Sequence, residues 1–167
     1  MGRLTPEEFA QAGKTPMVLI LDNIRSMHNV GSMFRTADCF LAEHIYLCGM
    51  TPEPGHHEIE KTALGATQTV AWTKVDDTLS CIQSLKEQGF RIAALEQAED
   101  SIDLRSYQVK GPTALVVGHE VMGVQQAVVD ACDDVIEIKQ FGTKHSLNVS
   151  VSAGMALFEI HKGLTAK

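Results

Sequence analysis

Short apolar runs alternate along the chain with segments whose apolar residues recur at helical spacing. Six runs predict strands: Met17–Leu21, His44–Cys48, Thr69–Val75, Arg91–Leu95, Thr113–Val117 and Val135–Ile138. Several of these runs are apolar without interruption, which is typical of strands in a parallel sheet that is covered on both faces. The pattern therefore predicts an α/β fold, with a parallel sheet flanked by helices.

Three helices are predicted from the same pattern. One covers Thr78–Gln88, between two aspartates and a glycine that can cap it, and a shorter one covers Gln125–Cys132. The last helix runs from about Asn148 to Lys162. Since no repeat or linker interrupts the alternation, we expect one domain over residues 16–167, after a lead-in at residues 1–15.

The composition excludes several classes of protein. With 44% hydrophobic and 21% charged residues, the chain of 167 residues is typical of globular rather than disordered proteins. It starts without an apolar signal region, and Met17–Leu21 is too short to span a membrane, so we expect neither secretion nor membrane association. The four cysteines form no C-x-x-C pair and lie in apolar segments, which predicts buried free thiols in a cytoplasmic protein: Cys39, Cys48, Cys81 and Cys132.

Charge is unevenly distributed along the chain. There are 14 Lys+Arg against 21 Asp+Glu, and this net charge of −7 argues against a protein that coats nucleic acid generally. Residues 96–137 hold nine acidic and two basic residues, whereas residues 138–167 hold four lysines and one acid. A local basic site on an acidic protein is therefore compatible with the composition.

Three polar, glycine-containing loops follow the carboxyl ends of predicted strands, where parallel α/β sheets bind their ligands: 22–35, 118–123 and 139–150. In the first loop we expect Asn29 to cap the following helix, Gly31 to allow close backbone approach, and Arg35 to lie about one turn into the helix. From this loop alone, Arg35 is explained equally well as a solvated helix residue or as a fork for a phosphate. Gly142 and Gly154, in and after the third loop, suggest another close approach by backbone or ligand.

Several common motifs are absent from the sequence. A dinucleotide-binding loop needs G-x-G-x-x-G, but the first loop has only Gly31, and Gly118 and Gly123 are not followed by the Lys-Ser of a P-loop. No serine has the flanking glycines of a hydrolase elbow. His56 and His57 lie in a Pro/Gly-rich segment without H-E-x-x-H, which favours a polar loop over a metal site. We therefore expect no metal site, no dinucleotide-binding site, no P-loop and no serine-hydrolase site.

The three loops together carry a more specific pattern. They read N-x-G-x-x-x-R-T-A at Asn29–Ala37, L-V-V-G-x-E-x-x-G at Leu115–Gly123 and S-L-N-V-S-V at Ser146–Val151. In order and spacing the pattern resembles the SpoU (TrmH-like) RNA ribose 2′-O-methyltransferases of the SPOUT superfamily, over about residues 16–162. That family usually has a proline, in an I-P-x-x-G context, where Lys139 stands in this chain.

The resemblance implies a fold, a cofactor and a partner. It implies a C-terminal segment threaded into a deep trefoil knot, a homodimer with active sites at its interface, and S-adenosyl-L-methionine as the methyl donor. It implies a catalytic cluster of Asn29, Arg35, Glu120, Ser146 and Asn148. The donor is expected against Leu95, Val117, Gly118, Ile138, Gly142 and Leu147. RNA is expected at Arg25, Arg35, Lys144 and His145.

Physical chemistry limits the roles of these residues. We expect Arg35 to anchor the phosphate beside the target ribose rather than to act as the base, because the pKa of arginine exceeds about 12. His145 is better tuned as a base, but a solvated loop histidine is the more frequent case. Glu120 is expected either to orient Arg35 across the cavity or to face the sulfonium of the donor.

A tRNA substrate is expected rather than rRNA. About sixteen residues precede the first strand and about five follow the last helix, so we expect no separate RNA-binding domain and a grip on compact RNA through the dimer surface. Six basic residues are expected on the face of the site, where they predict weak, salt-sensitive RNA binding: Lys14, Arg25, Arg35, Lys139, Lys144 and His145. Two alternatives stay open, namely a catalytically idle RNA-binding protein of this fold and a SPOUT methyltransferase that acts on a base.

Overall fold

Parallel strands in one sheet organise the molecule. The computed structural model describes residues 2–166, which contain seven strands in the order β3-β2-β1-β6-β4-β7-β5, and every adjacent pair is parallel. The strands are β1 (Thr15–Asp22), β2 (Ala42–Cys48), β3 (Trp72–Val75), β4 (Arg91–Leu95), β5 (Ile102–Asp103), β6 (Thr113–Val117) and β7 (Asp134–Glu137). The predicted parallel α/β sheet is therefore confirmed.

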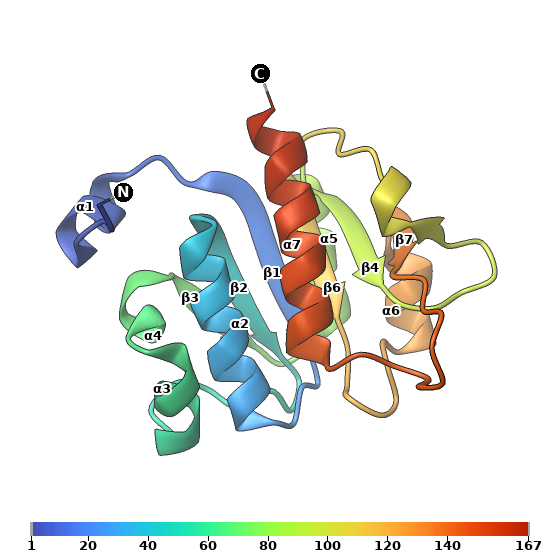
Figure 1. Ribbon diagram of the computed structural model, residues 1–167, viewed down its shortest axis with the longest axis horizontal. Helices are drawn as coiled ribbons and strands as arrows, with labels where there is room; N and C mark the ends of the chain where they lie inside the picture. Colours follow the sequence, from blue (N-terminus) through green and yellow to red (C-terminus); the bar gives the residue numbers. More distant parts are fainter. Residues whose placement is uncertain (1, 167) are drawn as a thin grey trace.

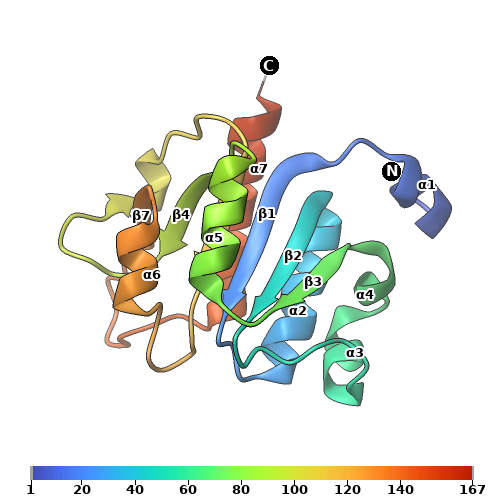
Figure 2. The ribbon, with the colours of Figure 1, turned by 180° about the vertical axis from the view of Figure 1, so that it is seen from behind.

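Helices cover both faces of the sheet. On one face lie α2 (Met27–Cys39) and α7 (Val149–Thr165), with α3 (His57–Ala63) and α4 (Ala66–Thr69) beside α2 (Figure 1). The other face carries α5 (Thr78–Glu87) and α6 (Gln126–Ala131) (Figure 2). A short helix, α1 (Pro6–Gln11), precedes β1, and a 3-10 turn, η1 (Leu104–Ser106), lies between β5 and β6.

The buried strand β1 explains why the strand sequences are apolar without interruption. Met17, Leu19 and Leu21 belong to the core beneath α2 and α7, whereas Val18 and Ile20 belong to the core beneath α5 and α6. Successive side chains of a strand point to opposite faces, and both faces are covered here. Every position from 17 to 21 is consequently buried.

The predicted strand boundaries are good in the middle of the sheet and poorer at its edge. Strands β4 and β6 have the predicted bounds. The strand predicted over Thr69–Val75 starts too early, because Thr69 ends α4 and β3 begins at Trp72. The hydroxyl of Thr69 donates hydrogen bonds to Asp38 and to the carbonyl of Ala66, which holds this residue in the helical turn.

Helix α1 lies in the lead-in, for which the apolar pattern predicts no element. Its cap is a reciprocal pair, in which the amide of Glu8 donates to the Thr5 hydroxyl at 3.2 Å and the amide of Thr5 donates to the Glu8 carboxylate at 2.7 Å. Pro6 occupies the first turn and Phe9 is buried. The tetrapeptide T-P-E-E is the local signal that predicts such a helix.

The cysteines differ in exposure. Cys48 and Cys81 are buried and Cys132 is half-buried, but Cys39 is exposed at the end of α2, so its predicted burial is wrong. The apolar residues around Cys39 face the sheet from neighbouring positions of the helix, whereas Cys39 itself points outward. In the described part of the chain, no helix has both the length and the apolar character needed to cross a bilayer.

A half-buried ion pair between neighbouring strands gives a prediction for the pH dependence of stability. Arg91 of β4 donates to both carboxylate oxygens of Asp134 of β7, at 2.5 and 2.7 Å, and this contact lowers the pKa of Asp134. A carboxyl group whose pKa is lower in the folded than in the unfolded chain stabilises the fold above about pH 4 and loses this effect as the pH falls. We expect Asp134→Asn to lower the free energy of unfolding by about 1–2 kcal/mol at neutral pH and by progressively less in acid. Urea denaturation across this pH range measures the difference; a constant difference would contradict the assignment.

Candidate active site

A cavity opens at the carboxyl edge of the sheet, beyond the ends of β4, β6 and β7. Its volume is about 540 Å³, within the range of about 300–1,000 Å³ that small-molecule sites usually have. Its walls come from the residues that follow these three strands and from the first turn of α7. Because β6, β4 and β7 are neighbours in the sheet, loops that are far apart in the sequence meet here. We call this space the first cavity.

Five of the six residues predicted to hold the donor line the first cavity: Leu95, Val117, Gly118, Ile138 and Leu147. Gly142 does not line it, and a Cβ there would meet no atom of residues 2–166 within 4 Å, so none of the described backbone approaches Gly142 closely. At Gly118, in contrast, a Cβ would overlap the backbone of Gly123 and Val124. This tight turn is closed by an antiparallel bridge between residues 119 and 123.

Three glutamates line the first cavity, and two of them were not predicted: Glu96 and Glu137. Glu96 directly follows β4, and this position at the carboxyl end of a strand is the signal that marks it. Its carboxylate accepts hydrogen bonds from the amides of Val124 at 2.9 Å and Gln97 at 2.8 Å. Over residues 2–166, the lining contains no lysine or arginine, so the cavity is suited to a cationic ligand.

A connected polar unit lies beside this cavity. The side-chain nitrogen of Asn29 donates to the Glu120 carboxylate at 3.3 Å. The side-chain oxygen of Asn29 accepts from the side-chain nitrogen of Asn148 at 3.1 Å. Asn148 is also the N-cap of α7, because its oxygen accepts from the amides of residues 150 and 151. Three of the five residues predicted for the catalytic cluster are thus joined, and a fourth, Ser146, lines the first cavity.

Glu120 orients the turn before α2. Its carboxylate accepts from the amides of Arg25 at 3.2 Å and Ser26 at 2.9 Å, in addition to Asn29. Burial raises the pKa of Glu120, but these hydrogen bonds outweigh burial and bring the pKa below its ordinary value, so the group is a carboxylate at neutral pH. Within residues 2–166, Glu120 makes no hydrogen bond or ion pair with Arg35 of the same chain, and its oxygens are engaged by this turn.

Arg35 lies outside the first cavity. Helix α2 begins at Met27 and is capped by Ser26, whose hydroxyl accepts from the amide of Asn29 at 3.2 Å, so the expectation that Asn29 is the cap is wrong. Arg35 is consequently in the third turn of α2, further into the helix than the one turn that was expected, and its side chain is exposed. The side chain of Asn29 is free for Asn148 because Ser26 provides the cap.

Lys14 was expected on the face of the site, but it does not lie there. It precedes β1 and therefore lies at the amino edge of the sheet, opposite the cavity. Its ammonium group sits over the ring of Phe9, 3.7 Å from the centroid, and donates to the carbonyl of the same residue. Packing against α1 explains this position.

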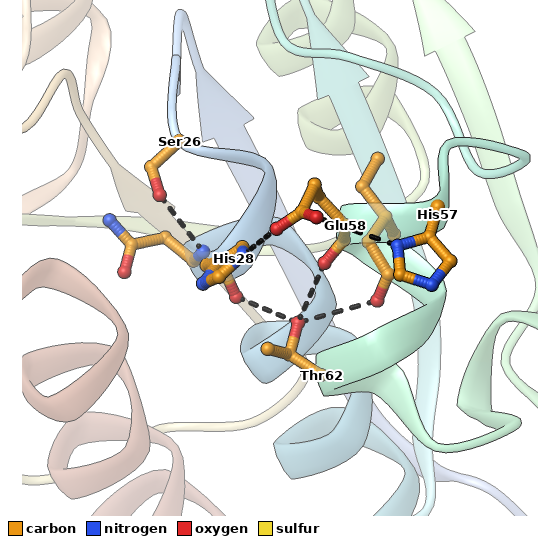
Figure 3. A network of polar contacts seen from close by, with 7 residues as sticks. Ser26, His28, His57, Glu58 and Thr62 are labelled. Carbon is orange, nitrogen blue, oxygen red and sulfur yellow. Dashed lines mark hydrogen bonds and ion pairs between the residues drawn. The ribbon is translucent and has the colours of Figure 1, made fainter.

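Helix α3 packs against the first turns of α2 through polar contacts (Figure 3). Glu58 contacts the ring of His28, and the Nδ1 atom of His57 lies 3.4 Å from the second oxygen of this carboxylate. The hydroxyl of Thr62 donates to the carbonyl of His28 at 3.0 Å. The contact with His28 lowers the pKa of Glu58. His57 thus begins a helix rather than lying in a loop, and no three His, Cys, Asp or Glu side chains of residues 2–166 gather as metal ligands.

Gly31 confirms the predicted close backbone approach and gives a stability prediction. A Cβ at this position would overlap the hydroxyl of Thr62 and the carbonyl of Ile59 in α3. We expect Gly31→Ala to lower the free energy of unfolding by about 1–3 kcal/mol, despite the better helix propensity of alanine. The matched control is Gly13→Ala, where an added Cβ meets no atom within 4 Å in the described part of the chain and the expected change is below about 0.5 kcal/mol. Equal denaturation midpoints for the two variants would contradict this packing.

A second cavity of about 350 Å³ adjoins the first. Its lining consists of Gln97, Glu137, Ile138, Lys139, Gln140, Phe141, Lys144 and His145. All of these except Lys139, Phe141 and Lys144 also line the first cavity, so the two spaces share a wall. Lys144 and His145, two of the predicted RNA ligands, therefore lie together, whereas Arg25 is exposed before α2.

Comparisons with known sequences agree on one family. The sequence profile of the SpoU rRNA Methylase family matches residues 16–158. A 23S rRNA (guanosine-2′-O-)-methyltransferase RlmB of Vibrio parahaemolyticus is 33% identical over 155 residues, which are 92% of this chain and 62% of the relative. A putative TrmH family tRNA/rRNA methyltransferase of Staphylococcus haemolyticus is 33% identical over 160 residues, which are 93% of this chain and 64% of the relative. The chain thus spans less than two thirds of the length of these relatives.

Solved structures share the fold over almost the whole chain. The TrmH/SpoU tRNA modifying enzyme of A. aeolicus superposes with a TM-score of 0.83 at 29% identity, covering 95% of this chain and 79% of that one. The AdoMet-bound rRNA methyltransferase of Sinorhizobium meliloti superposes with a TM-score of 0.84 at 26% identity, covering 96% and 60%.

Proposed function

Because the chain belongs to the SpoU rRNA methylase family, we propose that it transfers a methyl group from S-adenosyl-L-methionine to a ribose 2′-hydroxyl of RNA. The observation that carries this proposal is the first cavity, whose rim joins the three motif loops through Asn29, Glu120 and Asn148. The names of the relatives support it, since they include a guanosine-2′-O-methyltransferase and an AdoMet-bound rRNA methyltransferase. We propose tRNA as the first substrate to test and rRNA as the second.

The first cavity suits the donor in size and charge. When bound, the donor would supply a methyl group carried on a sulfonium. The ribose oxygen would form a bond to this methyl group while the sulfur–carbon bond breaks, the electron pair stays on sulfur and the hydroxyl proton is released. Leu95, Gly118, Ile138 and Leu147 would hold the donor, and Val117 would contact its apolar part. Carboxylates in the same wall stabilise a positive charge, which is the charge that distinguishes this donor.

The polar residues of the rim position the acceptor hydroxyl. Ser146 brings a hydroxyl to the first cavity, and Asn148 lies beside it between the lining residues Leu147 and Val149, where alignment contributes most of the rate. Glu120 and Asn29 keep this mouth in place through their hydrogen bonds. Arg35 anchors a phosphate of the RNA with its planar fork.

A homodimer accounts for the separation of Arg35 from the cavity. Helix α7 exposes Val151, Met155 and Phe158 on one side, at a spacing that forms an apolar stripe. Gly154 of α7 faces Thr36 of α2, so α7 packs beside the helix that carries Arg35. A second copy that covers the stripe carries its own Arg35 toward the first cavity of its partner, which is the arrangement that we propose.

We also propose the deep trefoil knot and the cytoplasmic location. The chain leaves β4, passes beyond β7 to form β5, and returns to β6 on the other side of β4. Segment 96–112 thereby passes to the far side of β7 and back, and α7 packs against it at η1 and at the contact of Gly163 with Val109. This course supports threading of the C-terminal segment. Four free cysteines support a reducing compartment.

The test of the proposed function uses labelled donor and total RNA from a strain that lacks the gene. We expect label at defined nucleotides, and mapping should place it on ribose 2′-oxygens. Label on a base would favour another SPOUT chemistry. RNA binding without transfer, together with no donor binding by calorimetry, would favour an idle scaffold.

His145→Ala is expected to retain most of the activity, within about fivefold of the unmodified protein. His145 is an exposed loop residue whose backbone carbonyl accepts from the Gln97 side chain at 3.5 Å, and no group of residues 2–166 makes a hydrogen bond with its ring. Initial rates at saturating donor measure the effect. A loss as large as that of Arg35→Ala would identify His145 as the base instead.

A further inference from the structure

The second cavity differs from the first in charge. Lys139 and Lys144 line it against the single acid Glu137, which gives a sum of +1 with histidine neutral. The first cavity is lined by three glutamates, and no lysine or arginine of residues 2–166 belongs to it. The two spaces thus favour ligands of opposite charge, a cation in the first and an anion in the second.

Phe141 gives the second cavity an aromatic wall. Its side chain is 83% exposed, although burial of an aromatic ring is strongly favourable. The guanidinium carbon of Arg105 lies 5.8 Å from the ring centroid, within the range of cation–π contacts. A carboxylate oxygen of Asp103 lies 2.5 Å from a terminal nitrogen of this guanidinium and holds it in place. An exposed ring among cationic side chains is the combination with which proteins stack unpaired nucleotides.

The shared wall places an occupant of the second cavity beside the first. Gln97 and His145 line both spaces, and the side chain of Gln97 donates to the carbonyl of His145 at 3.5 Å. Two ligands that occupy the two cavities therefore meet at this wall. Methyl transfer requires that the acceptor lie next to the donor in this way.

We infer that the second cavity is the acceptor subsite, where an unpaired RNA nucleotide stacks its base on Phe141 and places a flanking phosphate at Lys139 and Lys144. This inference rests on the proposed function, because it takes the occupant of the first cavity to be the methyl donor. Lys139 stands where the resembled family usually has proline, so this chain adds a cation at the subsite.

The first test is spectroscopic and uses the Phe141→Trp variant. The chain has one tryptophan, Trp72, which is half-buried in β3 at the opposite side of the sheet and serves as the background signal. An unpaired oligoadenylate of about ten nucleotides is expected to quench the added fluorescence by stacking, and donor alone is not. Quenching by donor alone would assign Phe141 to the donor site and overturn the inference.

The second test measures affinity with matched variants. Phe141→Ala is expected to weaken binding of the same oligonucleotide about tenfold and donor binding by less than about twofold. Phe141→Tyr keeps a stacking ring and should restore the affinity. Met50→Ala is the control, because Met50 is 74% exposed at the same edge of the sheet but lines neither cavity.

The third test uses salt. Lys139→Ala and Lys144→Ala are each expected to reduce the slope of log affinity against log salt by about 0.7, the value for one phosphate contact on a single strand. Unchanged oligonucleotide affinity in Phe141→Ala, with unchanged slopes in both lysine variants, would overturn the acceptor subsite alone. A chain that binds donor nowhere and methylates no RNA would instead overturn the proposed function.

Discussion

Replacing Arg35 with alanine is expected to lower methyl transfer at least about 100-fold while donor affinity changes by less than about twofold. Arg35 is exposed in the third turn of α2 and does not line the first cavity, so its removal leaves the donor contacts intact. What it removes is a planar fork that fixes a phosphate of the RNA, and with it the alignment of the hydroxyl. Single-turnover rates and donor calorimetry measure the two quantities separately.

Arg35→Lys is the matched variant, because it keeps the charge and loses the fork. We expect it to recover only part of the activity, since an ammonium group cannot make the paired contact. The folding of both variants should match the unmodified protein, as the side chain is on the surface of its helix. Loss of donor affinity with normal turnover would contradict the role proposed for Arg35.

Heterodimers of Arg35→Ala chains with Asn148→Ala chains are expected to recover about half of the activity of the unmodified dimer. If Arg35 serves the cavity of its partner, one of the two sites in such a dimer keeps both residues, and the other site lacks both. Asn148 belongs to the cavity side, because it is joined to Asn29 at the rim. Chains with two different affinity tags allow the heterodimer to be purified before rates are measured.

The control pairs Asn148→Ala with Ser146→Ala. Both substitutions damage the cavity side, so neither site of that heterodimer is complete and no recovery is expected. Recovery in this control as well would show that the single variants are merely unstable. Absence of recovery in both pairs would place Arg35 and Asn148 in a site built within one chain.

The middle of the sheet is predictable from the sequence because burial on both faces demands apolar residues at every position. Strands β4 and β6 follow this rule, and their ends coincide with the ends of the apolar runs. Helix α3 is not predictable in this way, because its place depends on tertiary contacts of Gly31 and Thr62 rather than on its own pattern. The start of α2 shows a second limit: Ser26 and Asn29 are both good capping residues, and only the partners of each side chain decide between them.

The motifs predict which residues lie beside the first cavity better than they predict the contacts that these residues make. The loop sequences select Glu120 and Asn148, and the structure shows both beside the first cavity. Spacing contains no information on the hydrogen bond of Glu120 to Ser26, since it joins residues 94 positions apart. Glu96 was missed because it belongs to none of the three motif loops, although it directly follows a strand.

The hydrogen bond between Asn29 and Asn148 joins residues 119 positions apart, and this separation has a consequence for synthesis. While the ribosome extends the chain, the early strands can collapse with α2, but the rim of the first cavity lacks its last member until α7 begins to emerge. A nascent chain that ends before Asn148 should therefore capture no donor. We therefore expect donor binding to appear only when α7 has emerged, so that shorter nascent chains do not sequester the donor.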